Sequence, residues 1–374
     1  MLPRCITRDL KWGTSIPFVN NSDSESKTID KSEPESSTII NNSEYINKVF
    51  YVWFDAPFGY YSILASKKDN WQEWLKDAEW ISTQAKDNIP FHTIIFPGAI
   101  LGSGLDLPLI SRICSTDYLL YEGKKFSKSQ NVGLFGDQVI KISNALEINE
   151  DYWRFYLVKI RPESHDSSFS MADFVNVIKT DLVNNIGNFI NRCNSLTNKI
   201  SIIENGENTN TNTNTNTNTN TNTNTNTNTN TKTKTNFSSR YDLSSGDLFL
   251  TRYRNKYIEL MNDFKFADAL KLCIEISSLG NKYIQINKPW TLFKTDIELA
   301  KQIIGFSNAI CWLLANLLKP FVPKTCQIIL DNIECSHSFI ELADESLIIE
   351  ITASGKIPLL FKNIDLVKIE NELL

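Results

Sequence analysis

The sequence has no Cys-x-x-Cys pair, and its seven cysteines are an odd number scattered along 374 residues. A disulfide framework usually has an even number of cysteines, and a zinc site commonly uses Cys-x-x-Cys pairs. Free thiols in a reducing compartment explain the pattern better, so we expect a cytoplasmic protein without a zinc site. The first dozen residues contain Arg4, Arg8, Asp9 and Lys11, which interrupt any apolar stretch that a secretory signal would need.

Long apolar runs and an excess of basic charge are absent as well. The longest uncharged run, 302–318, has about 17 residues and is too short and too polar for a membrane span, so we predict a buried helix. Lysine and arginine total 38 against 43 acidic residues, a net charge of -5. Any contact with nucleic acid must therefore come from local patches, and we expect no membrane partner.

Two tracts differ from the rest in composition. Residues 17–47 are rich in Ser, Asn, Asp and Glu and have few apolar side chains, and 208–236 alternates Thr with Asn almost without exception. Neither tract offers an apolar face that would offset the entropy of ordering it. We predict flexible segments without chemistry at both places.

The remaining sequence predicts two kinds of structure. Before about residue 150, the apolar runs 49–54 and 93–96 are predicted to be buried strands, each followed by a proline that can begin a helix. This pattern is typical of α/β folds. After residue 150 the apolar period is about 3.6, with a stripe through Leu182, Ile186, Cys193 and Leu196. Further helices are predicted at 247–288 and 296–318, so the second half is predicted to be a helical bundle.

A lysine-rich loop follows a predicted strand at 118–121. Its sequence after the Glu122-Gly123 turn is Lys-Lys-Phe-Ser-Lys-Ser, at 124–129. Lys125 and Lys128 are three residues apart and present two point charges that can meet polyphosphate oxygens, while the serines add hydroxyl donors. A solvated basic loop or a phosphorylation site would explain the same residues.

The string KFSKS at 125–129 resembles the KMSKS signature of class I aminoacyl-tRNA synthetases, in the form found in eukaryotic cytosolic methionyl-tRNA synthetases. Five further segments resemble that family in the same order. They are the amino-acid-pocket segment at 51–62, its next wall at 86–97, the stem segment at 152–170, and two anticodon-domain segments at 181–192 and 281–290.

The resemblance implies an α/β fold in which 1–150 is the second half of a Rossmann-like catalytic domain and 151–345 an all-α anticodon-binding helical bundle. Residues 346–374 resemble the segment that ends the family's core. The family's HIGH motif and zinc knuckle have no counterpart in the sequence. This implies that the chain depends on a missing half, which a separate chain with the HIGH motif would supply, or that it is a truncated gene product.

The family's methionine-pocket positions are matched by Trp53, Ala56, Pro57, Tyr60, His92 and Phe96. An aromatic pocket suits a thioether, which is soft and apolar. Lys125 and Lys128 are the candidates for stabilising the pyrophosphate that leaves ATP, with Mg²⁺ bridging phosphates. Arg8 and Asp87 match positions that contact ATP. Apart from the resemblance, Trp53 and Phe96 would be core aromatics, His92 a core histidine and Asp87 a surface acid.

The anticodon positions of the family are matched by Asn188, Arg192 and Trp290. Asn188 and Arg192 are four residues apart and share one helix face, which would otherwise be an ordinary polar surface. Trp290 matches the residue that stacks on the first anticodon base. Stacking of this kind contributes on the order of 1–3 kcal/mol per base.

The resemblance implies methionine-tRNA ligase activity, in which methionine is activated with ATP and transferred to tRNA(Met). Two alternatives stay open. The chain would also fit a tRNA anticodon-binding protein with a vestigial catalytic half, or an inactive relic. Decay of the pocket or the lysine loop would favour these alternatives, but Trp53, Tyr60, His92, Lys125 and Lys128 are all present.

Overall fold

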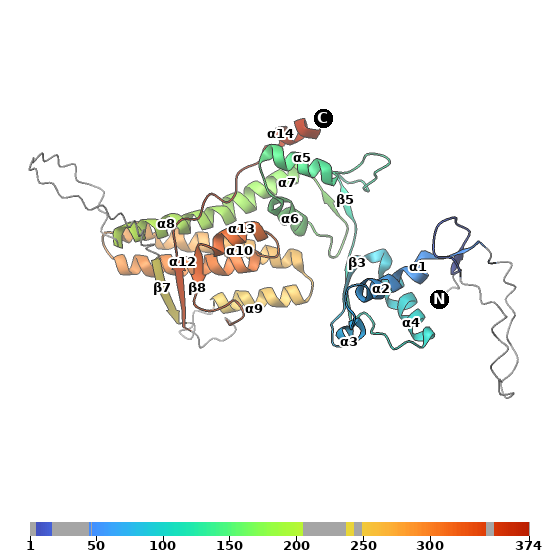
Figure 1. The fold of residues 1–374 in the computed structure, drawn as a ribbon. Coiled ribbons are helices and arrows are strands. Elements are labelled where there is room, and N and C mark those ends of the chain that lie inside the picture. The colour runs from blue at the N-terminus through green and yellow to red at the C-terminus, as the bar shows by residue number, and fades with distance from the viewer. Residues whose placement is uncertain are drawn as a thin grey trace, which may run out of the picture. The chain divides into compact units, whose positions relative to one another are not determined.

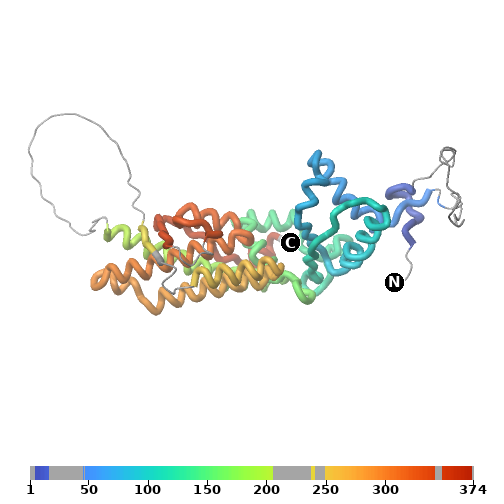
Figure 2. The backbone as a smooth tube through the Cα atoms, turned by 90° about the horizontal axis from the view of Figure 1, so that it is seen from below, coloured from blue at the N-terminus to red at the C-terminus, as the bar shows by residue number. Residues whose placement is uncertain are grey.

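The computed structural model describes residues 5–16, 45, 47–204, 237–242, 249–341 and 348–373. The predicted flexible tracts 17–47 and 208–236 fall outside these residues, apart from positions 45 and 47. The chain forms two compact units, Met1–Thr116 and Asp117–Leu374. Figures 1 and 2 show the elements of each unit in colours that follow the sequence.

Unit 1 is a small α/β structure. Its elements are β1 (Thr7–Arg8), β2 (Val49–Phe50), α1 (Val52–Asp55), the 3-10 turn η3 (Ala56–Phe58), α2 (Gly59–Ala65), α3 (Trp71–Lys76), β3 (Ile81–Ala85), the 3-10 turn η4 (Lys86–Asn88), the π-helical turn η5 (Phe91–Ile95), α4 (Phe96–Ser103) and β4 (Arg112–Thr116). Strands β3 and β4 pair in parallel, from Ile81 with Arg112 to Ala85 with Thr116. The chain returns between them through α4, which is the crossover that parallel strands require.

The strand predicted at 93–96 is wrong, because these residues belong to η5 and α4. Burial explains the helix. His92 and Phe96 are 3% and 1% exposed and Ile100 is also buried, so burial recurs every four residues, whereas Ile94 is 51% exposed. A strand would bury every second residue instead. The strand predicted at 49–54 is only two residues long, since β2 ends at Phe50 and α1 follows.

Unit 2 contains the helical bundle. Its elements are β5 (Leu119–Tyr121), α5 (Gly136–Leu146), α6 (Glu150–Lys159), β6 (Ser167–Phe169), α7 (Met171–Val177), the π-helical segment η6 (Ile178–Gly187), α8 (Asn188–Glu204), β7 (Phe237–Asp242), α9 (Phe249–Asn262), α10 (Phe266–Asn287), α11 (Pro289–Leu292), α12 (Ile297–Leu318), α13 (Pro323–Leu330), β8 (Ile333–Cys335), β9 (Ile348–Ala353) and α14 (Leu366–Leu373).

The long helices α8, α10 and α12 pack together, and both views show them side by side. The apolar stripe predicted on 182–196 is buried in this core, as is the predicted helix at 302–318, which lies in α12. Among the described helices, α12 is the one whose length and composition would suit a membrane span. Its apolar residues are accounted for by packing in the core of unit 2.

The bundle also carries an antiparallel sheet of order β7-β9-β8, which the all-α prediction did not include. The central strand β9 buries Ile349, Ile351 and Ala353 and exposes Ile348 and Glu350. This alternation is the sequence signal of a half-buried strand. The alternation extends over only six residues, which makes it a weak signal. The partner strand β7 also lies far away in the sequence, whereas β8 precedes β9 by a short segment.

The chain divides into its two compact units between Thr116 and Asp117, whereas the sequence predicts a domain boundary near residue 150. The lysine loop at 124–129 is therefore part of the unit that contains the helical bundle. The two compact units are defined by packing alone and do not test family domain boundaries. The domains 1–150, 151–345 and 346–374 therefore stay predictions.

Candidate functional site

His92 lies at the centre of the predicted pocket in unit 1. Its Nδ1 atom is 2.9 Å from the backbone oxygen of Asn88, and its Nε2 atom is 2.9 Å from the hydroxyl of Tyr60. A carbonyl oxygen can only accept, so Nδ1 carries the hydrogen, and in the neutral ring Nε2 accepts from the Tyr60 hydroxyl. The imidazole is therefore fixed on both sides within a buried position.

Aromatic rings surround this histidine. The Trp53 ring stacks on Phe91 at 4.7 Å and meets His92 edge-on at 5.8 Å. The Tyr60 ring lies 5.8 Å from His92 and 6.2 Å from Phe96. Four predicted pocket residues are thus brought together, because α1, α2 and η5 converge at this point. Ala56 and Pro57 lie in the connecting turn η3, with Ala56 exposed and Pro57 buried.

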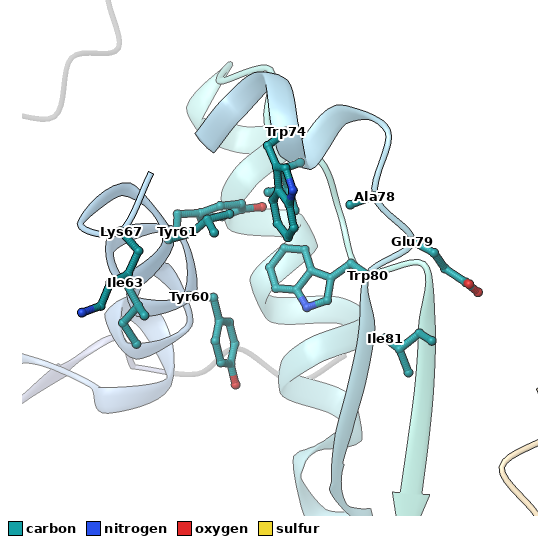
Figure 3. A pocket seen from close by; sticks show the side chains of 11 residues that line it. Tyr60, Tyr61, Ile63, Lys67, Trp74, Ala78, Glu79, Trp80 and Ile81 are labelled. Atoms are coloured by element: carbon teal, nitrogen blue, oxygen red, sulfur yellow. The ribbon is translucent and has the colours of Figure 1, made fainter. Parts of the chain in front are cut away.

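Tyr60 also lines a cavity of about 400 Å³. Figure 3 shows Trp74 and Trp80 beside Tyr60 and Tyr61, with Lys67 and Glu79 farther out. Tyr60 is 43% exposed and its ring meets Trp80 edge-on at 5.8 Å. Tyr60 therefore lines this cavity and also forms a hydrogen bond to His92 through its hydroxyl.

Arg8 and Asp87 both lie in unit 1. The Arg8 guanidinium lies 4.1 Å from the Tyr51 ring centre, and it donates to the backbone oxygens of Cys5 and Thr7 at 2.9 and 2.8 Å. Arg8 also lines a cavity of about 520 Å³ whose wall includes Asp55. Asp87 is exposed in η4, the turn that leads from β3 toward His92.

The lysine loop in unit 2 is a hairpin with exposed charges. Backbone hydrogen bonds join Ser127 and Val132 in both directions, at 2.8 and 2.9 Å. Lys125 and Lys128 are exposed, and the Lys125 ammonium lies 5.4 Å from the Tyr118 ring. An exposed ammonium on a short hairpin can meet a polyphosphate without first losing a carboxylate partner.

The base of this loop is anchored to the bundle. The Glu122 carboxylate accepts from the backbone N–H of Met171 at 2.8 Å, and the N–H of Gly123 donates to the Ser168 hydroxyl at 2.8 Å. Burial raises the pKa of Tyr121, with Glu122 adding to the effect, so this tyrosine stays neutral behind the lysines. The predicted pocket belongs to unit 1 and the lysines belong to unit 2.

Of the three predicted anticodon residues, Arg192 and Trp290 lie side by side, and Asn188 is joined to Arg192 through Asn281. The Arg192 guanidinium lies 5.9 Å from the Trp290 ring centre, and Trp290 is 39% exposed. A cavity of about 270 Å³ lies between them, with Asn191 also in its wall. Asn188 donates to Asn281 at 3.2 Å. The arrangement offers an accessible aromatic face beside a cation and amide groups, which suits an unstacked base.

Asn281 and Gln285 at this place were missed by the sequence analysis. Both accept hydrogen bonds from Arg192, at 3.4 and 3.1 Å. They are four residues apart in the segment 281–290, and this spacing was the available signal. Among the described residues, no group of three or more His, Cys, Asp and Glu side chains is arranged to bind a metal ion.

Two family models match the chain. The model of class I (M) tRNA synthetases matches residues 35–194, and the model of the anticodon-binding domain of methionyl tRNA ligase matches 248–371. The methionine-tRNA ligase of Acanthamoeba polyphaga mimivirus is 47% identical over 97% of this chain and 56% of its own length. The human cytoplasmic methionine-tRNA ligase is 34% identical over 89% of this chain and 33% of its own length.

The chain spans about half the length of the viral relative and a third of the human one. A solved structure of Mycobacterium tuberculosis methionyl-tRNA synthetase bound by methionyl-adenylate shares the fold, with a TM-score of 0.60 and 21% identity over 87% of this chain and 53% of that chain. The models match in chain order and include both the lysine loop and the Trp290 site, so the chain belongs to the methionyl-tRNA synthetase family of class I aminoacyl-tRNA synthetases.

Proposed function

We propose that the chain provides the methionine pocket, the lysine loop and the anticodon-binding surface of a methionine-tRNA ligase. The observation that carries the proposal is the setting of His92, which is buried, hydrogen-bonded at both ring nitrogens and surrounded by aromatic rings. Such a pocket accepts a thioether, because sulfur packs favourably against aromatic edges.

In the proposed reaction, a methionine carboxylate oxygen attacks the α-phosphorus of ATP. The new O–P bond forms as the bond to pyrophosphate breaks, and negative charge grows on the leaving group. Lys125 and Lys128 stabilise that charge, together with Mg²⁺ that enters with ATP. The carboxylate is already ionised at neutral pH, so this step needs no general base. Arg8 contacts the triphosphate and Asp87 the nucleoside.

The second half-reaction transfers the methionyl group to the 3′ end of tRNA(Met). Trp290 stacks on the first anticodon base, while Asn188 and Arg192 contact the anticodon by hydrogen bonds. Because relatives such as the human enzyme are named cytoplasmic, we propose the cytoplasm as the place of action. We also propose that the HIGH motif of the family, from the same or a separate chain, completes the ATP site.

The test is methionine-dependent ATP–pyrophosphate exchange and charging of tRNA(Met). The chain is assayed alone and co-expressed with the part of the mimivirus relative that lies outside the match. Exchange by the pair, with less or none from either partner alone, is the expected result. Binding of tRNA(Met) without exchange under any condition would instead favour the anticodon-binding protein. The absence of both tRNA binding and exchange would contradict both proposals.

A further inference from the structure

Arg192 is oriented by side chains of a second helix. Its NH1 group lies 3.3 Å from the backbone oxygen and 3.4 Å from the side-chain oxygen of Asn281, and its NH2 group lies 3.1 Å from the side-chain oxygen of Gln285. These acceptors come from α10, whereas Arg192 belongs to α8. The orientation of the guanidinium therefore depends on contacts between residues about 90 positions apart in the chain.

The amide of Asn281 is itself fixed by its surroundings. Its Nδ2 group donates to the backbone oxygen of Asn185 at 3.1 Å and to that of Ser277 at 3.3 Å. Because carbonyl oxygens only accept, the nitrogen must face them, and the Oδ1 atom must face Asn188 and Arg192. Asn281 thus joins two of the predicted anticodon residues in one hydrogen-bonded arrangement.

The three acceptors around Arg192 are all neutral. They set the plane of the guanidinium without cancelling its charge, as a carboxylate in the same place would do. A guanidinium has five N–H donors. Asn281 and Gln285 use at most three of them, so within the described part of the chain at least two are left for an RNA acceptor beside Trp290.

We propose that Asn281 and Gln285 are positioning residues for anticodon recognition, which fix Arg192 in the plane needed to read a base and keep its charge available to RNA. This inference rests on the proposed anticodon role of Arg192 and Trp290. Gln285 is the better residue to test because it is exposed, so its replacement leaves the core of the bundle intact. Asn281 also joins two helices, so its replacement would affect the stability of the bundle as well as RNA recognition.

The experiment measures binding of the full chain to an RNA hairpin with the anticodon CAU and to the same hairpin with one anticodon base changed, over a range of salt concentrations. Gln285→Met removes the acceptor at similar size. We expect it to lower the preference for CAU by about tenfold, because a hydrogen bond to a charged group is lost. Gln285→Glu pairs with Arg192 and should reduce the slope of log affinity against log salt by about one.

Ile286→Glu is the matched control, because it adds the same charge to an exposed neighbouring position on another face of α10. It should leave both the CAU preference and most of the salt slope unchanged, and all variants should keep the melting temperature of the parent chain. Parent-like preference and salt slope in both Gln285 variants would overturn the inference alone. Failure of the parent chain to bind the CAU hairpin would overturn the proposed anticodon role together with it.

Discussion

At the scale of single residues, the structure brings several of the predicted pocket residues together, while the pocket and its ligand stay proposals. The rings of Trp53 and Tyr60 contact His92, Phe96 contacts Tyr60, and one hydroxyl links Tyr60 to the histidine. The tertiary structure adds the carbonyl of Asn88, which fixes the hydrogen on Nδ1. The orientation of the imidazole is therefore set by two residues from different elements, Tyr60 and Asn88.

Tyr60→Phe tests this hydrogen bond. The ring that packs on Phe96 and Trp80 stays, but His92 loses the donor at Nε2. One hydrogen bond is worth about 1 kcal/mol, so we expect the KM for methionine to rise about fivefold in pyrophosphate exchange by the completed enzyme. Tyr61→Phe is the control, since its hydroxyl donates to Pro108 instead. Equal effects of both substitutions on KM would contradict the role of Tyr60.

Lys128→Ala tests the lysine loop. The ammonium is exposed and far from the hydrogen bonds that anchor the loop at Glu122 and Gly123, so the fold should not change. Loss of a charge that stabilises the transition state should lower the exchange rate about a hundredfold or more. Binding of the CAU hairpin should stay near that of the parent chain. A parallel loss of exchange and hairpin binding would show that the substitution disturbs unit 2 as a whole.

At the scale of elements, the anticodon recognition that we propose for α8 depends on how closely α10 approaches it. Gly280 permits this approach, because a Cβ atom at that position would overlap the ring of Phe189. Asn281, the next residue, is thereby brought within hydrogen-bonding distance of Asn188 and Arg192. A glycine inside a helix usually costs stability, and here a packing contact explains it.

Gly280→Ala should therefore destabilise unit 2 despite alanine's higher helix propensity. Overpacking of a close helix contact costs about 1–3 kcal/mol, which should appear as a lower midpoint in urea unfolding followed by circular dichroism. Gly136→Ala is the control, because a Cβ there meets no atom within 4 Å. The idea fails if both variants unfold at the midpoint of the parent chain.

At the scale of the whole molecule, the cysteines report on folding. All seven are free, and Cys193, Cys273, Cys311 and Cys326 are buried in unit 2. Burial raises the pKa of the Cys193 and Cys273 thiols. Cys5 is exposed, and hydrogen bonds with Thr7 lower the pKa of its thiol.

A thiol reagent should therefore react first with Cys5 at pH 7. A lowered pKa means more thiolate at that pH, and a raised pKa means less, so the buried thiols of unit 2 should react only as urea unfolds it. A reagent that releases a chromophore when it reacts with a thiol measures both the fast reaction of Cys5 and the slow reaction of the buried thiols. Cys5→Ser should remove the fast phase, and a fast phase that persists in this variant would contradict the assignment.

The sequence by itself determined the features that depend on local patterns. The buried stripe through Leu182 and Leu196, the helix at 302–318 and the strand before the lysine loop follow from periodicity, which each segment carries alone. The order of the matching segments likewise indicated the family, which the comparisons confirm.

Only the tertiary structure decided what distant segments do to one another. Residues 93–96 are helical because His92, Phe96 and Ile100 share one buried face, and the strand β9 pairs with β7 across more than 100 residues. The same is true of Asn281 and Gln285, which meet Arg192 only because α8 and α10 pack closely at Gly280. A local pattern can indicate which residues share a face, but packing between elements sets which distant residues that face meets.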